Sequence, residues 1–421
     1  MTISKIKTFT VFQKIVGLTG LMLISQGCAS TTERTSNTAP SSTVKLEKTV
    51  GRMPEFSWDT MPLYMHVWKK NSYTKDELNY LAKYPLITIE KAQGSREGTI
   101  QQGTLKAARE IKEINPNTKI LYYKNIVIDW ESGASKALKE IPNGYLQKSN
   151  GDYPVVNQNS KAKFFDISKD EVHQWWLSDA KAMLDDPSID GLFIDANIKV
   201  LIESYFAKGQ GLGTSKAKDL IAGYHKLLTT INNEFRQDNL IIANIIRARF
   251  ENAGLEYMQY FDGSYFENFE LNVNGVSKPD YLVKGLEAGQ KAAQDGKILA
   301  FTAGLGDSLK KDSSGIGLDE ARHKIGSIEQ VQERVEYLTA IFLTMAEEHS
   351  YFYPHDGLGV STDKNGKYRN KTWMHTFPIF NNRLGAPKGL AKRDGYVFTR
   401  EFEYCSVYLN VETEEATLKW K

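Results

Sequence analysis

The chain has 421 residues, 41% of them hydrophobic, which is enough to bury a large core in one large domain or in two or three smaller ones. The 53 Lys and Arg residues nearly balance the 51 Asp and Glu residues, and no long basic run is present that would follow a phosphate backbone. The composition therefore argues against nucleic acid as a partner.

The N-terminus has the organisation of an export signal. Lysines precede the apolar stretch IVGLTGLMLI (15–24), which is too short to span a bilayer. The following SQGCAS resembles a bacterial lipoprotein cleavage site with Cys28 as the lipidated residue, although Ser25 departs from the usual Leu. We predict a signal peptide over 1–28 and an exported periplasmic or cell-surface protein, anchored to a membrane through Cys28. Ordinary secretion and a buried N-terminal helix remain alternatives.

Residues 29–55 are predicted to form a flexible tether. They are rich in Ser and Thr and show almost no apolar periodicity until their end, as expected of a linker outside a packed core. The only other cysteine is Cys405, so a lipidated Cys28 would leave the fold without a disulfide.

From residue 62 onward, short apolar runs alternate with longer amphipathic stretches, the pattern of repeated strand-helix units with a parallel sheet. We therefore predict one α/β domain over 56–383, a (β/α)8 TIM barrel. Its strands are expected in the runs 62–68, 86–92, 119–129, 191–197, 240–246, 263–270, 297–303 and 350–356.

The helices between these runs carry start and stop signals. Thr74 with Glu77, and Ser168 with Glu171, have the spacing of a capping box. Asn115 precedes a proline that disfavours a longer second helix. Long helices are expected at 215–237 and 326–349.

Two segments depart from the alternation. The insertion 130–165 follows the third strand and is rich in Gly, Asn, Ser and Tyr, as loops over the catalytic face of such barrels are. Residues 384–421 alternate apolar and polar side chains between Gly and Pro, which predicts a short antiparallel β segment packed on the barrel.

Polar and aromatic residues end most of the predicted strands, where chemistry lies in a barrel of this kind. We expect them to surround one site. They are His66, Trp68, Glu90, Lys91, Lys124, Asn125, Asp129, Trp130, Asp195, Asn197, Asn244, Arg247, Tyr265, Glu267, Asn268, His355 and Asp356.

Asp195 and Glu267 are the candidate catalytic pair. Each follows apolar or aromatic residues at the end of a predicted strand. Cleavage of a glycoside requires one carboxylic acid to protonate the leaving oxygen and one carboxylate to attack or to activate water. An apolar collar raises the pKa of a carboxyl group kept as an acid, and hydrogen-bond donors such as Asn197 or Asn244 keep the other ionised. If the two do not meet, Asp129 or Glu90 is the next candidate. A strand that merely ends in an Asx turn is the simpler reading of Asp195.

Three motifs carry a family resemblance over most of residues 60–415: GLFIDAN (191–197), GSYFENF (263–269) and the closing LGAP…REFEYCSVYLN. They resemble hypothetical glycosyl hydrolase family fifteen and the endo-polygalactosaminidase-like glycosidases. In related retaining clans, which include the α-galactosidases, the nucleophile ends strand four and the acid/base ends strand six. The resemblance thus implies Asp195 as nucleophile and Glu267 as acid/base, but it names no sugar.

Cations and aromatic residues at the same rim are predicted to bind substrate. Lys91, Lys124 and Arg247 either hold an anionic substituent, such as sulfate, or form ion pairs with neighbouring carboxylates. Trp68, Trp130 and Tyr265 either stack on sugar faces or pack in the core.

Other chemistries lack a motif. The sequence has no HExxH, CxxC pair, P-loop, strand-linked GxGxxG or GxSxG elbow, and we predict neither a cofactor nor a metal. The prediction is an exported retaining glycoside hydrolase of a polysaccharide. A polysaccharide lyase, using Lys or His as the base, and a non-catalytic glycan-binding lipoprotein are the alternatives.

Overall fold

The computed structural model separates Met1–Glu47 from a second unit, Lys48–Lys421. All elements reported below lie in this second unit. Among the described residues, no helix is long and apolar enough to cross a membrane. The structure describes residues 51–130, 136–156, 161–267, 277–304, 328–355, 358–360, 362 and 373–421.

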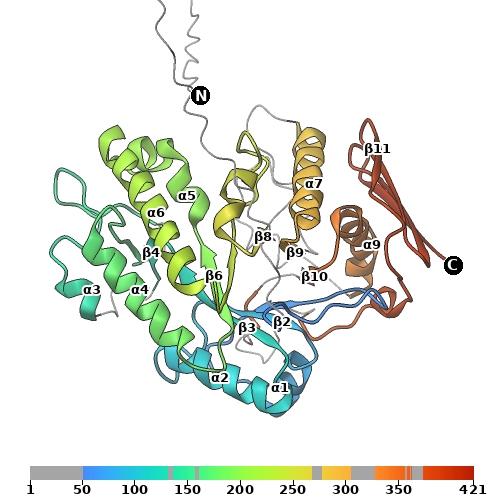
Figure 1. Ribbon diagram of the computed structural model, residues 1–421, viewed down its shortest axis with the longest axis horizontal. Coiled ribbons are helices and arrows are strands. Elements are labelled where there is room, and N and C mark those ends of the chain that lie inside the picture. The colour runs from blue at the N-terminus through green and yellow to red at the C-terminus, as the bar shows by residue number, and fades with distance from the viewer. Residues whose placement is uncertain are drawn as a thin grey trace, which may run out of the picture. The chain divides into compact units, whose positions relative to one another are not determined.

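Eight parallel strands form one sheet in which the strand order follows the chain. A parallel bridge between Leu63 and Phe352 joins the two edges, and the amide of Phe352 donates to the carbonyl of Pro62 at 2.9 Å. The sheet is thus nearly closed into a barrel, which confirms the predicted (β/α)8 fold (Figure 1). Seven of the eight strands fall within a predicted run, and β9 extends one residue beyond its run. The strands are β1 (Met65–Val67), β2 (Leu86–Ile89), β3 (Lys119–Asn125), β6 (Gly191–Asp195), β7 (Leu240–Ala243), β8 (Gly263–Glu267), β9 (Ile298–Gly304) and β10 (Ser350–His355).

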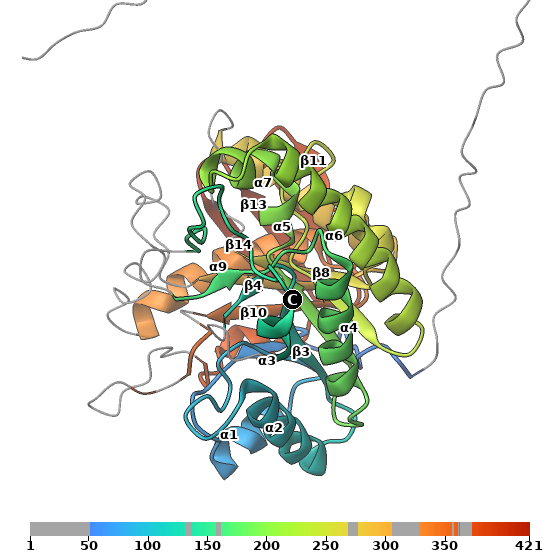
Figure 2. The ribbon, with the colours of Figure 1, turned by 90° about the vertical axis from the view of Figure 1, so that its left-hand side faces the viewer.

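Helices lie outside the sheet, and neighbours such as α1 and α2, or α4 and α6, lie side by side (Figure 2). The main ones are α1 (Lys75–Leu81), α2 (Ile100–Ile114), α3 (Lys136–Glu140), α4 (Asp170–Leu184), α5 (Asn197–Leu201), α6 (Thr214–Phe235), α7 (Lys278–Gln294) and α9 (Ile328–Met345). Short helices of other kinds are the π-helix η1 (Tyr205–Gly209) and the 3₁₀ helices η2 (Leu255–Tyr260) and η4 (Pro378–Asn381).

Two of the three predicted helix signals are confirmed. Thr74 caps α1 in a capping box with Glu77, and α2 ends with Asn115 as its C-cap. The cap at Ser168 is wrong: Lys169 is the N-cap of α4 and makes no side-chain cap bond. The Ser168 hydroxyl instead donates to Asp166 at 2.6 Å and accepts from the ammonium of Lys216 at 2.8 Å, so its oxygen serves a side chain and not the first turn of the helix.

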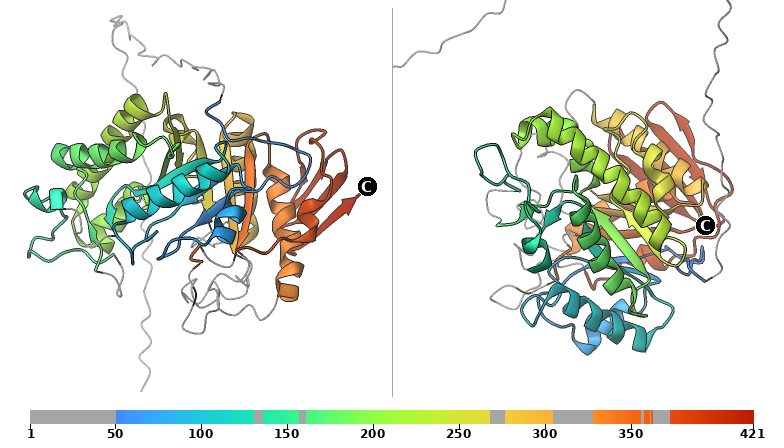
Figure 3. Two further views of the ribbon diagram at one scale, coloured as in Figure 1. Left: turned by 90° about the horizontal axis from the view of Figure 1, so that it is seen from below. Right: turned by 60° about the vertical axis from the view of Figure 1, so that its left-hand side comes forward.

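The C-terminal segment forms a separate antiparallel sheet, as predicted, which lies against α9 (Figure 3). Its strands are β11 (Lys392–Asp394), β12 (Val397–Glu401), β13 (Cys405–Asn410) and β14 (Glu415–Trp420). Buried Arg400 on β12 caps the C-terminal end of α9 by donating to the carbonyls of Leu343 (2.9 Å) and Ala346 (2.5 Å). In the insertion after β3, β4 (Ile128–Asp129) pairs with β5 (Lys163–Phe164).

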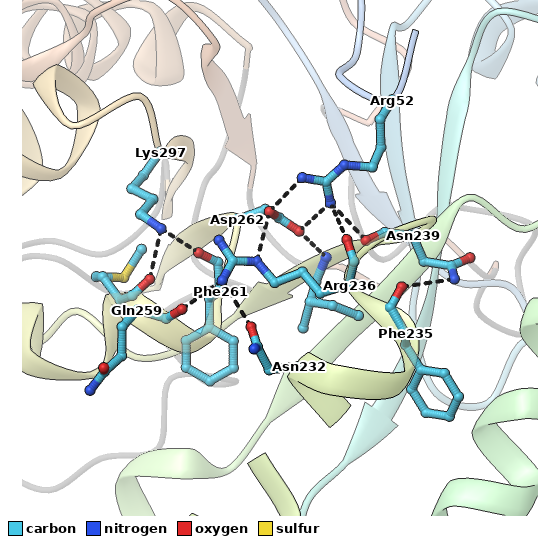
Figure 4. A network of polar contacts seen from close by, with 11 residues as sticks. Arg52, Asn232, Phe235, Arg236, Asn239, Gln259, Phe261, Asp262 and Lys297 are labelled. Carbon is cyan, nitrogen blue, oxygen red and sulfur yellow. Dashed lines mark hydrogen bonds and ion pairs between the residues drawn. The ribbon is translucent and has the colours of Figure 1, made fainter. Parts of the chain in front are cut away.

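A polar network closes the barrel end at which β7 and β8 begin (Figure 4). The guanidinium of Arg52 binds both carboxylate oxygens of Asp262 at 2.8 Å, and Arg236 adds a third bond at 3.0 Å. The same carboxylate accepts from the amide of Ile241 at 2.8 Å. Arg52, in the segment predicted as the end of the tether, is therefore fixed to the end of the barrel opposite the carboxyl ends of the strands.

Candidate active site

Asp195 and Glu267 are the last residues of β6 and β8, and β7 lies between these two strands. Because the strands are parallel, their carboxyl ends meet at one end of the barrel. Asn244, which directly follows β7, donates from Nδ2 to Oδ1 of Asp195 at 3.2 Å and to Oε2 of Glu267 at 3.0 Å. One amide group therefore joins the two carboxyl groups.

Tyr123 on β3 is the second partner of Asp195. Its hydroxyl donates to Oδ2 of Asp195 at 2.7 Å and accepts from Asn125 at 2.9 Å and from the indole of Trp130 at 3.2 Å. Burial, followed by the negative charges of Asp195 and Glu90, raises the pKa of Tyr123, so the phenol keeps its proton. Both oxygens of Asp195 are thus acceptors, as the oxygens of a carboxylate anion are.

The side chain of Glu267 is one-third exposed. Besides Asn244, its neighbour is the guanidinium of Arg247, whose Nη2 lies 3.9 Å from Oε2 of Glu267. Burial lowers the pKa of Arg247 and the charge of Glu267 opposes this shift. A guanidinium remains charged all the same, so it places a cation beside this carboxyl group.

Glu90, the residue after β2, is a third carboxyl group near the pair. It is 4% exposed and binds the ammonium of Lys91 at 2.6 Å. Burial raises the pKa of Glu90 to about 7; Lys91 opposes this rise, and the nearby charges of Asp195 and Glu267 add to it. Glu90 therefore exchanges a proton near neutral pH.

Lys91 stays cationic in this setting. Its burial acts to lower its pKa, but the charges of Glu90, Asp195 and Glu267 outweigh that effect and raise it. The ammonium also lies over the rings of Tyr123 (4.9 Å) and Trp130 (5.3 Å). Of the two roles predicted for Lys91, binding an anionic substituent or pairing with a neighbouring carboxylate, the structure has the ion pair, with Glu90 as the partner.

An aromatic layer lies below the carboxyl groups inside the barrel. His66, Phe193 and Tyr265 contact one another edge to face, with ring centroids 4.8 to 5.2 Å apart. His66 and Tyr265 are 1% and 2% exposed, so they form the floor of the site. Half-buried Trp68 packs on Gly359, where an added Cβ would lie 2.8 Å from the indole.

Three predicted residues lie away from the carboxylate pair. The ammonium of Lys124 pairs with Asp179 on α4, on the outer side of β3. Asp129 accepts from the hydroxyl of Tyr145 at 2.7 Å. Asn197 is fully buried; it donates to the carbonyl of Ile194 at 2.8 Å and accepts from Tyr224 at 2.9 Å, so it shapes the turn after β6.

Four predicted residues fall outside what the structure describes: Cys28, Asn268, Asp356 and the side chain of His355. Among the described residues, no group of three or more His, Cys, Asp or Glu side chains could hold a metal ion.

Tyr123 was not predicted, although its place two residues before Asn125 puts both side chains on the inner face of β3.

The model of hypothetical glycosyl hydrolase family 15 matches residues 112–406 of this chain. Solved structures resemble it at low identity. The glycoside hydrolase domain of PelA from Pseudomonas aeruginosa is 13% identical, with a TM-score of 0.39 over 60% of this chain and 87% of that one. A maltogenic α-amylase, AmyB from Thermotoga neapolitana, is 11% identical, with a TM-score of 0.44 over 83% and 86%. The α-galactosidase AgaA from Geobacillus stearothermophilus is 9% identical, with a TM-score of 0.43 over 85% and 49%. No curated protein has a significantly similar sequence.

Proposed function

Because this chain belongs to hypothetical glycosyl hydrolase family 15, we propose that it cleaves the glycosidic bonds of a polysaccharide or oligosaccharide with retention at the anomeric carbon. Family membership itself supports cleavage of glycosidic bonds. The observation that carries the finer proposal is the single amide of Asn244 between Asp195 and Glu267.

The spacing of the two carboxyl groups supports retention. Retaining enzymes hold them about 5–5.5 Å apart, whereas inverting enzymes leave about 6.5–9.5 Å for a water molecule. The oxygens that accept from Asn244 lie 3.2 and 3.0 Å from one nitrogen. Because both bonds share this nitrogen, the two oxygens cannot lie farther apart than the two bond lengths added together. That limit is shorter than the distance between carboxyl groups in inverting enzymes.

The surroundings of each group suggest its role. Asp195, with both oxygens accepting hydrogen bonds, is the nucleophile: it attacks the anomeric carbon as the bond to the leaving oxygen breaks. Glu267, on the other side of Asn244 from Asp195, gives its proton to that oxygen. It then removes a proton from water, whose oxygen attacks the same carbon and releases Asp195.

Export and anchoring are a second part of the proposal. The apolar stretch 15–24 followed by SQGCAS supports lipidation of Cys28. Metabolic labelling with a fatty acid, followed by membrane fractionation, tests this. Label in the parent protein but not in Cys28→Ala supports anchoring, and an unlabelled protein in the medium indicates ordinary secretion.

The catalytic proposal is tested by measuring reducing-sugar release and separating the products from neutral, uronic and sulfated polysaccharides. The parent is compared with Asp195→Asn, Glu267→Gln and a matched control, Asp295→Asn, whose exposed carboxylate pairs with Lys291. We expect release from one glycan by the parent and the control, and loss in both site variants. Loss in Glu90→Gln but not in Asp195→Asn would move the role of nucleophile to Glu90. Binding without release in all of them would indicate a glycan-binding protein.

A further inference from the structure

A cavity of about 230 Å³ lies at the carboxyl end of β3, beside the carboxylate pair. Tyr123 and Trp130 line the side next to Asp195, to which Tyr123 is hydrogen-bonded. The cavity then passes to the outer side of β3, where Lys124, Trp175 and Asp179 line it. It therefore continues from the catalytic end of the barrel into the space between β3 and α4.

The lysines that line this cavity are paired with carboxylates. Lys124, which is 6% exposed, pairs with Asp179, and its ammonium lies 5.1 Å and 5.0 Å from the ring centroids of Trp175 and Trp176. Lys91 pairs with Glu90, and Asp129, which accepts from the hydroxyl of Tyr145, is a further acidic group of the lining. An anionic ligand would find no unpaired cation among these residues and would meet the carboxylate of Asp179.

The remaining lining suits a sugar. The indoles of Trp130 and Trp175 line it, with the ammonium groups of Lys91 and Lys124 over their rings, and Gln101 adds an amide. Pockets for larger organic ligands measure about 300–1,000 Å³, so a cavity of about 230 Å³ is sized for a single ring.

We propose that this cavity is a subsite for one neutral sugar ring, next to the ring held at Asp195 and Glu267, and that Asp179 excludes anionic sugars by neutralising Lys124. This proposal rests on the proposed function, because the adjacent ring is the one that Asp195 and Glu267 would cleave. It identifies the substrate as a neutral glycan. Asp179 is the specificity-determining residue.

Binding is measured in the Asp195→Asn protein, which prevents turnover. The probes are neutral trisaccharides from amylose, mannan and galactan, and a galacturonate trisaccharide, followed by tryptophan fluorescence and calorimetry. We expect a neutral trisaccharide to bind, and Trp175→Ala to raise its Kd about tenfold, since stacking against the ring is lost. Trp175→Phe should restore most of the affinity.

Asp179→Asn is the sharper test. It frees the ammonium of Lys124 for a carboxylate, so we expect the Kd for the galacturonate trisaccharide to fall about tenfold. The matched control is Asp185→Asn, the same change on the exposed partner of Lys181, directly after α4. It should change neither Kd. Circular dichroism and thermal melting confirm that each variant is folded.

The outcomes separate this proposal from the proposed function. If the parent cleaves a glycan while Trp175→Ala and Asp179→Asn leave its KM and sugar preference unchanged, the subsite is refuted and the hydrolase stands. If no glycan is cleaved but a neutral trisaccharide binds in a Trp175-dependent way, the subsite stands and the hydrolase is refuted. Binding of none of the probes, or preference for galacturonate before any mutation, overturns the subsite.

Discussion

Asp195 and Glu267 accept hydrogen bonds from the same nitrogen, Nδ2 of Asn244, at 3.2 and 3.0 Å. An amide nitrogen carries two protons, so one bond goes to each carboxyl group. Asn244 follows β7, the strand between those that end in Asp195 and Glu267. The strand order thus places the donor between the two acceptors, and Asn244 becomes the residue that sets their spacing.

Asn244→Ala should lower kcat about 100-fold, a typical effect of disturbing a positioned acid or base. Asn244→Asp should lower it further, because a third negative charge replaces the shared donor. Steady-state kinetics on the glycan identified by the panel measures both effects, with melting temperature as the check on folding. An unchanged kcat in Asn244→Ala would show that the amide does not position the pair.

Tyr123→Phe removes only the hydroxyl that donates to Asp195 at 2.7 Å. The ring should keep its stacked contact with Phe193, whose centroid is 5.8 Å away. We expect kcat to fall about tenfold. The free energy of unfolding should fall by about 1–3 kcal/mol, because the same hydroxyl accepts from Asn125 and Trp130, which lose their partner. A loss of stability with full activity would contradict the role assigned to this phenol.

Because the pKa of Glu90 is raised, we expect the free energy of unfolding to depend on pH. Its pKa of about 7 in the folded protein lies above the value of about 4.3 of an unperturbed Glu, so the folded state binds more protons between these two values. The stabilisation that Glu90 contributes is therefore complete below about pH 4 and is lost as the pH rises through about 7.

Glu90→Gln cannot titrate, so its free energy of unfolding relative to that of the parent should rise by about 3–4 kcal/mol between these limits. Urea unfolding at a series of pH values measures the difference. The control Glu113→Gln, at an exposed position on α2, should show no such window. A flat difference for Glu90→Gln would contradict the raised pKa.

Asp262→Asn tests the network at the opposite end of the barrel. It leaves the guanidinium groups of Arg52 and Arg236 without their shared anion, and the loss of one partner of a buried pair costs about 3–5 kcal/mol. Asp170→Asn, which removes the exposed partner of Lys226, should cost at most about 1 kcal/mol. Equal midpoints of chemical denaturation for the two variants would refute this difference.

The sequence predicted the fold more completely than the site. Each of the eight barrel strands coincides with a predicted run, apart from one extra residue at the end of β9, because strands buried on both faces read as short apolar stretches. The antiparallel sheet of the C-terminal segment, which the alternating sequence pattern predicted, is also confirmed. The cap predicted at Ser168 is wrong because its hydroxyl oxygen accepts from Lys216 on α6, a contact between segments that are distant in the sequence.

For the site, the residues at the ends of the predicted strands were only in part the ones that lie together in the structure. Asp195, Asn244 and Glu267 were named and lie together, although their roles stay a prediction. Neighbours on a strand face opposite sides, so Lys124 could not share the inner face with Asn125. The same alternation pairs Tyr123 with Asn125, but only the pairing of β3 with β6 brings its hydroxyl to Asp195.

The most direct test of the mechanism is the configuration of the first product, followed by proton NMR in D₂O from the moment the parent enzyme is added to the identified substrate. Retention predicts that the first anomeric signal has the configuration of the cleaved bond, and that the opposite anomer grows only by mutarotation. An initial product of opposite configuration would contradict the account of Asp195 as a nucleophile.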